Sequence, residues 1–84
     1  MSKDLPVLYI KPTCPWCIEA VDFLDRHKIS YRKVDILKEK GAREEMEELS
    51  GQGKVPTLDW HGEVLADFGE AELKPFLKKL GIIS

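Results

Sequence analysis

Hydrophobic and polar positions in the first half of the chain change their spacing twice, and each change marks a predicted element. Val7-Leu8-Tyr9-Ile10 is a short apolar run, typical of a strand buried inside a sheet. From residue 15 to about residue 28 the apolar side chains form a wide helical stripe: Ile18, Ala20, Val21, Phe23 and Leu24. Residues 30–36 alternate, with Tyr31, Lys33 and Asp35 opposite Arg32, Val34 and Ile36. The pattern predicts a strand, a helix and a parallel strand, joined by a right-handed crossover.

The second half predicts a helix, a hairpin and a final helix. Residues 37–49 are rich in Glu and Lys and place Ala42, Met46 and Leu49 at helical spacing, which indicates an amphipathic surface helix. Residues 57–60 and 63–66 are short strands around His61-Gly62, a pair that suits a two-residue hairpin turn. Residues 70–80 have one apolar helical face, consisting of Leu73, Phe76, Leu77 and Leu80. Pro75 lies inside this last helix, so we expect the helix to start late or to bend there.

The order of these elements indicates an α/β protein. It reads β-α-β-α-β-β-α, which predicts a thioredoxin-like fold with a four-stranded mixed sheet between helices. With 84 residues, the chain has the length of one small domain. We therefore expect residues 1–84 to form a single domain.

Charge and hydropathy exclude several classes of partner. Thirteen Lys and Arg residues and fifteen Asp and Glu residues give a net charge of −2, with the two signs interspersed, so no nucleic-acid partner is expected. No apolar run approaches the roughly 18 residues of a membrane span, and the N-terminal residues lack the apolar core of a signal peptide. We expect a soluble cytoplasmic protein, without a membrane partner and monomeric.

The two cysteines of the chain are the main candidates for chemistry. Cys14 and Cys17 lie two residues apart, between the first strand and the first helix, which is typical of a thiol–disulfide redox motif. Pro15 suits the first helical position, so Cys14 is predicted at the N-cap, where unpaired N–H groups favour a thiolate. Cys14 is therefore the expected exposed nucleophile. Cys17, one turn later and less exposed, is the expected resolving thiol.

Neighbouring residues suggest helpers and one alternative. Lys11 places a cation near Cys14, and Thr13 offers a hydroxyl or an N–H. A zinc site would need Cys14, Cys17, His27 and His61 together, but the histidines lack ligand spacing. His27 is more simply a residue that complements the helix dipole, and His61 a turn residue, so no metal is expected.

The residues around the dithiol resemble the glutaredoxin family in its two-cysteine form. Cys14-Pro15-Trp16-Cys17 is an aromatic variant of the family's Cys-Pro-Tyr-Cys motif, Lys11 lies where the family commonly has a lysine, and Lys54-Val55-Pro56-Thr57 is similar to its Thr-Val-Pro segment. The resemblance implies a cis Val55–Pro56 bond facing the cysteines, with the Val55 backbone pairing to a bound peptide. It also implies reduction of protein disulfides or glutathionylated proteins, with glutathione as the reductant.

The same resemblance implies a glutathione site and leaves two alternatives open. Its residues are Lys11, Trp16, Val55, Pro56, Asp67 and Phe68, with Trp16 packing over the groove and Asp67 and the Phe68 backbone taking the γ-glutamyl end. Leu65-Ala66-Asp67-Phe68-Gly69 departs from the Gly-Gly that many members carry, which keeps thioredoxin reductase open as the electron donor. A protein holding an iron–sulfur cluster between two chains is the alternative of another class, and Pro15 argues mildly against it.

Overall fold

The computed structural model describes residues 5–83, and its centre is a four-stranded sheet in the order β2-β1-β3-β4. The strands are β1 (Val7–Ile10), β2 (Arg32–Asp35), β3 (Thr57–Trp60) and β4 (Glu63–Ala66). β1 is parallel to β2 and antiparallel to β3, and β4 is antiparallel to β3. The predicted mixed sheet is confirmed.

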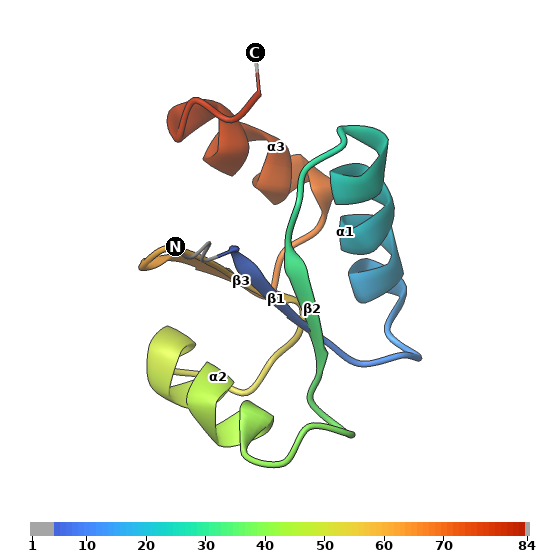
Figure 1. Ribbon diagram of the computed structural model, residues 1–84, viewed down its shortest axis with the longest axis vertical. Coiled ribbons are helices and arrows are strands. Elements are labelled where there is room, and N and C mark those ends of the chain that lie inside the picture. Colours follow the sequence, from blue (N-terminus) through green and yellow to red (C-terminus); the bar gives the residue numbers. More distant parts are fainter. Residues whose placement is uncertain (1–4, 84) are drawn as a thin grey trace.

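Three helices cover the two faces of this sheet. α1 (Pro15–Arg26) and α3 (Glu70–Lys79) lie on one face, and α2 (Ala42–Ser50) lies on the other (Figure 1). Each helix buries its apolar stripe against the strands, as the periodicity predicts. The thioredoxin-like arrangement of elements is therefore confirmed.

The hydrophobic core has one part on each face of the sheet. The part under α1 and α3 consists of Leu8, Ala20, Phe23, Leu24, Leu58, Phe68, Leu73 and Leu77. The part under α2 consists of Tyr9, Val34, Ile36, Ala42 and Met46. Because Tyr31 packs against the first part and Val34 against the second, the predicted alternation along β2 is confirmed. The Tyr9 hydroxyl donates a hydrogen bond of 2.8 Å to Glu45 Oε1, which fixes α2 against β1.

The predicted start of the second helix at residue 37 is wrong. α2 begins at Ala42, and the chain before it forms turns. Asp35 Oδ1 accepts a hydrogen bond from the Leu37 N–H, and the Asp35 carbonyl accepts from the Lys38 and Glu39 N–H groups. Leu37 is 63% exposed, so no apolar contact favours a helix there. The Asp35 side chain offers the backbone an alternative to helical hydrogen bonding.

Two smaller differences concern helix ends. α1 ends at Arg26 because Lys28 has a left-handed φ of 55° and the Ile29 N–H bonds back to the Leu24 carbonyl, which closes the helix. α3 begins at Glu70 and continues through Pro75, so a late start is wrong. Ala71, whose carbonyl loses its helical partner at this proline, is exposed to water.

Within residues 5–83, no helix is long and apolar enough to cross a membrane.

Candidate functional site: the Cys14–Cys17 dithiol

Cys14 is the N-cap of α1, as predicted, and Pro15 follows at the first helical position. Its backbone is extended, with φ −89° and ψ 117°. This geometry turns the sulfur back toward the helix, where it accepts a hydrogen bond from the Cys17 N–H over 3.3 Å. A donor aimed at sulfur stabilises the negative charge that the sulfur carries when a disulfide bond to it breaks.

Cys17 lies one turn later on the inner side of α1 and is only 1% exposed. Burial, together with the hydrogen bond to the neighbouring Cys14 thiol, raises the pKa of Cys17 to about 12. Cys14 is half-buried, so the two thiols differ in their access to solvent. The dithiol therefore has one sulfur that meets solvent and one that is held back as a protonated thiol.

The segment before β3 brings its backbone to the Cys14 sulfur. The Val55–Pro56 peptide bond is cis, which confirms the expectation from the resemblance. The Cys14 thiol donates to the Val55 carbonyl over 3.9 Å. Val55 thus lies across from the exposed sulfur, while Pro56 is buried at the start of the strand. Two of the predicted site residues are brought to the dithiol in this way.

Three further predicted residues meet in a hollow on the α3 side of the dithiol. Its volume is about 320 Å³, and we call it the Trp16 hollow after the residue that contributes its indole; its lining consists of Trp16, Asp67, Phe68, Gly69 and Glu72. Trp16 is 56% exposed, whereas the ring of Phe68 belongs to the core. Asp67 has a left-handed φ of 54°, and its N–H donates to the Pro56 carbonyl over 2.9 Å. The Lys54 ammonium lies 3.9 Å from the Asp67 carboxylate.

Sequence reasoning missed three residues in or beside the Trp16 hollow: Gly69, Glu72 and Glu19. Gly69 is the N-cap of α3, and its N–H donates to Glu72 Oε1 over 2.8 Å. The spacing of Gly69 and Glu72 is half of a capping box, which is the sequence signal for this contact. Glu19 reaches across from α1 and accepts a 2.8 Å hydrogen bond from the Glu70 N–H. No local sequence pattern predicts the contact between Glu19 and Glu70, because the two residues are 51 positions apart.

Lys11 lies apart from the Trp16 hollow, on the β2 side of the dithiol. There it lines an apolar cavity of about 280 Å³ together with Ile10, Pro12, Cys17, Ile18, Val21 and Lys33. The Lys11 carbonyl accepts from the Cys14 N–H over 3.3 Å, which closes the turn that precedes the helix. The predicted residues therefore occupy two sides of the dithiol and do not form one continuous pocket.

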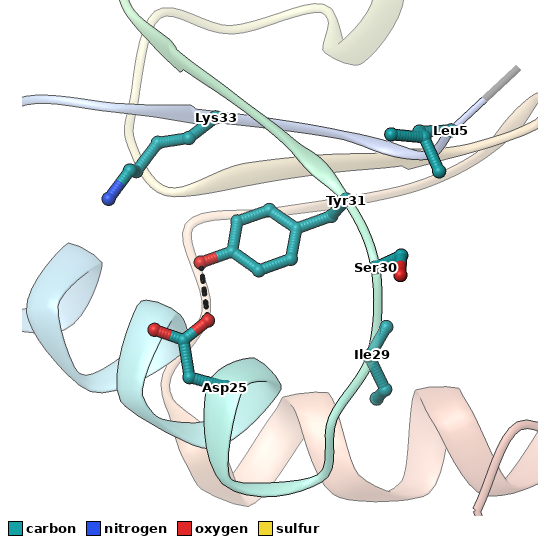
Figure 2. Close-up of a pocket in the computed structure, with 6 residues that line it drawn as sticks. All are labelled: Leu5, Asp25, Ile29, Ser30, Tyr31 and Lys33. Carbon is teal, nitrogen blue, oxygen red and sulfur yellow. Dashed lines mark hydrogen bonds between the residues drawn. The ribbon is translucent and has the colours of Figure 1, made fainter.

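A further hollow lies beyond this cavity, at the far end of α1 (Figure 2). Figure 2 shows the Tyr31 hydroxyl pointing at Asp25, to which it donates a hydrogen bond of 3.0 Å. Burial and this hydrogen bond raise the pKa of Tyr31 to about 12, so the hydroxyl stays protonated at neutral pH. Its wall is completed by Leu5, Ile29, Ser30 and Lys33. The hollow offers no thiol and no free base, and we assign no chemistry to it.

The zinc alternative fails on position. His27 is the C-cap of α1, at the opposite end of that helix from Cys14, and stacks on Phe23 with 4.3 Å between ring centroids. His61 lies in the turn between β3 and β4, beside Trp60. In the part of the chain that the structure describes, no three His, Cys, Asp or Glu side chains are grouped to hold a metal ion.

Fold and site together define a class of protein: a thioredoxin-like protein that presents a half-buried cysteine at a helix N-terminus with a fully buried partner cysteine one turn away. Residues 7–65 match the family model described as Glutaredoxin. The chain belongs to the glutaredoxin family, and family and fold support a thiol–disulfide oxidoreductase role.

Similar proteins agree with this assignment. A relative from Clostridium pasteurianum, described as an uncharacterized glutaredoxin-like 8.6 kDa protein in the rubredoxin operon, is 33% identical over 72 residues, covering 86% of this chain and 96% of the relative. The crystal structure of the thioredoxin-like protein BC3987 superposes with a TM-score of 0.77 at 29% identity, covering 86% of this chain and 99% of the other. Glutaredoxin grx-1 from Archaeoglobus fulgidus has a TM-score of 0.78 at 23% identity, covering 92% and 89%. At that identity the last likeness shows the fold alone.

Proposed function

We propose that this protein is a glutathione-dependent thiol–disulfide oxidoreductase that reduces protein disulfides and glutathione mixed disulfides. The observation that carries the proposal is the asymmetry of the dithiol. Cys14 is half-exposed and receives an N–H hydrogen bond, whereas Cys17 is buried and protonated. Such an arrangement suits one attacking sulfur and one resolving sulfur.

The reaction follows from these positions. The Cys14 thiolate attacks one sulfur of the substrate disulfide, so a mixed disulfide forms and the other substrate sulfur leaves as a thiolate that takes up a proton. Cys14 then carries no charge, which removes one of the causes that keep Cys17 protonated. Cys17 loses its proton and attacks the Cys14 sulfur, forming the Cys14–Cys17 disulfide and releasing the second substrate thiol. The substrate gains two electrons, and the protein loses two.

Glutathione would return the protein to the dithiol state. One glutathione thiolate attacks the Cys14 sulfur and frees Cys17, and a second attacks the glutathione sulfur of that mixed disulfide, which releases glutathione disulfide. Lys11 on one side and Val55, Pro56, Trp16, Asp67 and the Phe68 backbone on the other are the residues that we assign to glutathione. Membership of the glutaredoxin family supports this choice of reductant.

The proposal includes the setting of the reaction. A dithiol that cycles between its reduced and oxidised states needs a reducing compartment, so we propose that the protein is cytoplasmic. We also propose that it is monomeric and that its partners are disulfide-containing or glutathionylated proteins.

A coupled assay tests the reductant. The protein is supplied with NADPH, a small disulfide and either glutathione with glutathione reductase or thioredoxin reductase alone, and the loss of NADPH absorbance is followed. We expect turnover that depends on the protein in the glutathione arm. Turnover only with thioredoxin reductase would overturn the glutathione assignment and leave the dithiol chemistry intact. Absence of turnover in both arms would contradict the oxidoreductase proposal and favour the cluster-binding alternative.

A further inference from the structure

The start of α3, beside the dithiol, already holds carboxylates of the protein itself. A helix N-terminus attracts anions because its first N–H groups lack helical partners. Here the Gly69 N–H donates to Glu72 Oε1 and the Glu70 N–H donates to Glu19 Oε1, both over 2.8 Å. Glu72 belongs to α3, whereas Glu19 comes from α1, the helix that carries the cysteines.

Glu19 also lies against the wall of the Trp16 hollow. A Cβ placed on Gly69 would lie 3.2 Å from Glu19 Oε1 and 3.2 Å from two ring carbons of Trp16. The carboxylate and the indole therefore both pack against Gly69, so closely that a side chain there would crowd them. Trp16 and Glu19 are three residues apart on α1 and share one face of that helix. Glu19 thus reaches the hollow that a substrate group next to the Cys14 sulfur would enter.

The charges around this hollow are mainly negative. Its two charged lining residues are Asp67 and Glu72, and Glu70 follows at the helix start. Lys54 lies 3.9 Å from Asp67 and Arg26 lies 3.3 Å from Glu70, so the nearby cations are already paired with acids. A carboxylate that entered the hollow would meet like charges and would have to displace Glu19 to reach the Glu70 N–H.

We infer that Glu19 is a specificity-determining residue of the dithiol site, whose carboxylate occupies the start of α3 and makes the Trp16 hollow select against carboxylates near the reacting sulfur. Neutral and cationic groups are preferred there. The inference rests on the proposed disulfide exchange at Cys14. Under it, the γ-glutamyl carboxylate of glutathione reaches the start of α3 only by displacing Glu19, so Glu19 weakens the binding of glutathione at the Trp16 hollow without preventing it. The inference names the class of disulfide that the protein reduces best: one whose cysteines are flanked by neutral or basic groups.

A matched pair of small disulfides tests this assignment. Oxidised glutathione carries four carboxylates, and its tetraethyl ester carries none while keeping the same skeleton and amines. Each is mixed in excess with the reduced protein, and the oxidation of the two thiols is followed by quenching with an alkylating agent and mass spectrometry. The quantity of interest is the rate constant for the acid divided by that for the ester.

Three variants isolate Glu19. Glu19→Ala frees the Glu70 N–H, and we expect the acid-to-ester ratio to rise about three- to fivefold, the size of a charge–helix-terminus interaction. Glu19→Gln keeps an oxygen that accepts from Glu70 but removes the charge, so we expect a rise of about twofold. Glu48→Ala removes one negative charge from an exposed position on α2, on the opposite face of the sheet, and it should leave the ratio unchanged.

The outcomes separate this inference from the proposed function. An unchanged ratio in Glu19→Ala, or an equal rise in Glu48→Ala, would overturn the role of Glu19 and leave the oxidoreductase proposal standing. If Glu19→Ala does not fold, as judged by circular dichroism, Glu19→Gln decides by the same criterion. If neither disulfide oxidises the wild-type dithiol, the oxidoreductase proposal fails, and the inference fails with it.

Discussion

The backbone N–H of Cys17 points at the sulfur of Cys14 over 3.3 Å, while the Cys17 sulfur itself is buried. One residue therefore serves the exposed sulfur in two ways. Its N–H stabilises charge on Cys14 when a mixed disulfide breaks, and its thiol is the group that resolves that disulfide. Both roles depend on Pro15 and Trp16 completing the first turn of α1 between the two cysteines.

Because Cys14 is the attacking thiol and Cys17 the resolving thiol, substituting each cysteine should give a different phenotype. Cys14→Ser should abolish all exchange, because no exposed sulfur remains. Cys17→Ser should keep turnover of glutathione mixed disulfides, which need one thiol, and lose reduction of protein disulfides, which need two. Steady-state rates with a glutathionylated peptide and with a protein disulfide measure this. Equal losses in both variants and both assays would be incompatible with the assigned roles.

The buried thiol of Cys17 predicts a pH-dependent stability. Its pKa in the folded protein is raised to about 12, above the value of about 8.5 expected in an unfolded chain. A raised folded pKa gives stability that is present below the unfolded pKa and is lost as pH rises toward the folded one. Between about pH 8 and about pH 10 the reduced protein should lose about 1 to 2 kcal/mol of unfolding free energy from this group.

Urea unfolding across that interval measures the loss. Cys17→Ala should show a flatter dependence on pH than the wild type, even if it is less stable throughout. The interval stops at about pH 10 because the buried Tyr9 and the half-buried Tyr31, whose pKa values are also raised, add the same kind of loss at higher pH. Parallel profiles for the wild type and Cys17→Ala would show that Cys17 is not the cause.

Gly69 predicts a local packing defect. Its φ of −116° suits any residue, so Gly69→Ala adds no backbone strain and only pushes a methyl group against Trp16 and Glu19. We expect a cost of about 1 kcal/mol in unfolding free energy and a change in tryptophan fluorescence. Gly53→Ala is the control, because the Cβ there meets the movable end of the Glu47 side chain. A larger cost for Gly53→Ala than for Gly69→Ala would refute the packing described here.

We predict that removing Lys11 weakens the use of glutathione and that removing Lys33, the other lysine of the same cavity, does not. Lys11→Ala should raise the KM for glutathione about two- to fivefold at low salt, since a partly exposed cation contributes modestly to binding a carboxylate, and the effect should shrink as salt is added. Lys33→Ala, which also removes a lysine from the cavity on the β2 side, serves as the comparison. The same KM in wild type and Lys11→Ala at low salt would remove Lys11 from the glutathione site.

The sequence predicts the secondary structure well where local patterns decide it. The apolar run of β1, the Cys14-Pro15 helix start and the His61-Gly62 hairpin each depend on neighbouring residues, and the structure has all three where they were expected. The start of α2 was wrong because one side chain, Asp35, competes for the backbone hydrogen bonds of residues 37–39. Helical periodicity does not register such competition.

The candidate site was only partly predictable, for a related reason. Cys14, Cys17, Trp16 and the cis proline follow from a motif and a family resemblance. The separation of Lys11 from Asp67 to opposite sides of the dithiol depends on how α1 and α3 pack. The contact between Glu19 and Glu70 crosses 51 positions and joins a carboxylate to a backbone N–H, so neither charge pairing nor spacing reveals it.

The most direct test of the account is to trap the intermediate. Cys17→Ser is incubated with glutathione disulfide, and the adduct is located by digestion and mass spectrometry, with wild-type protein treated in parallel. We predict one glutathione on Cys14 in the variant, and a Cys14–Cys17 disulfide without adduct in the wild type. A stable glutathione adduct on wild-type Cys14 with Cys17 still reduced, or no adduct on Cys14 in the variant, would contradict the assignment of Cys14 as nucleophile and Cys17 as the resolving thiol.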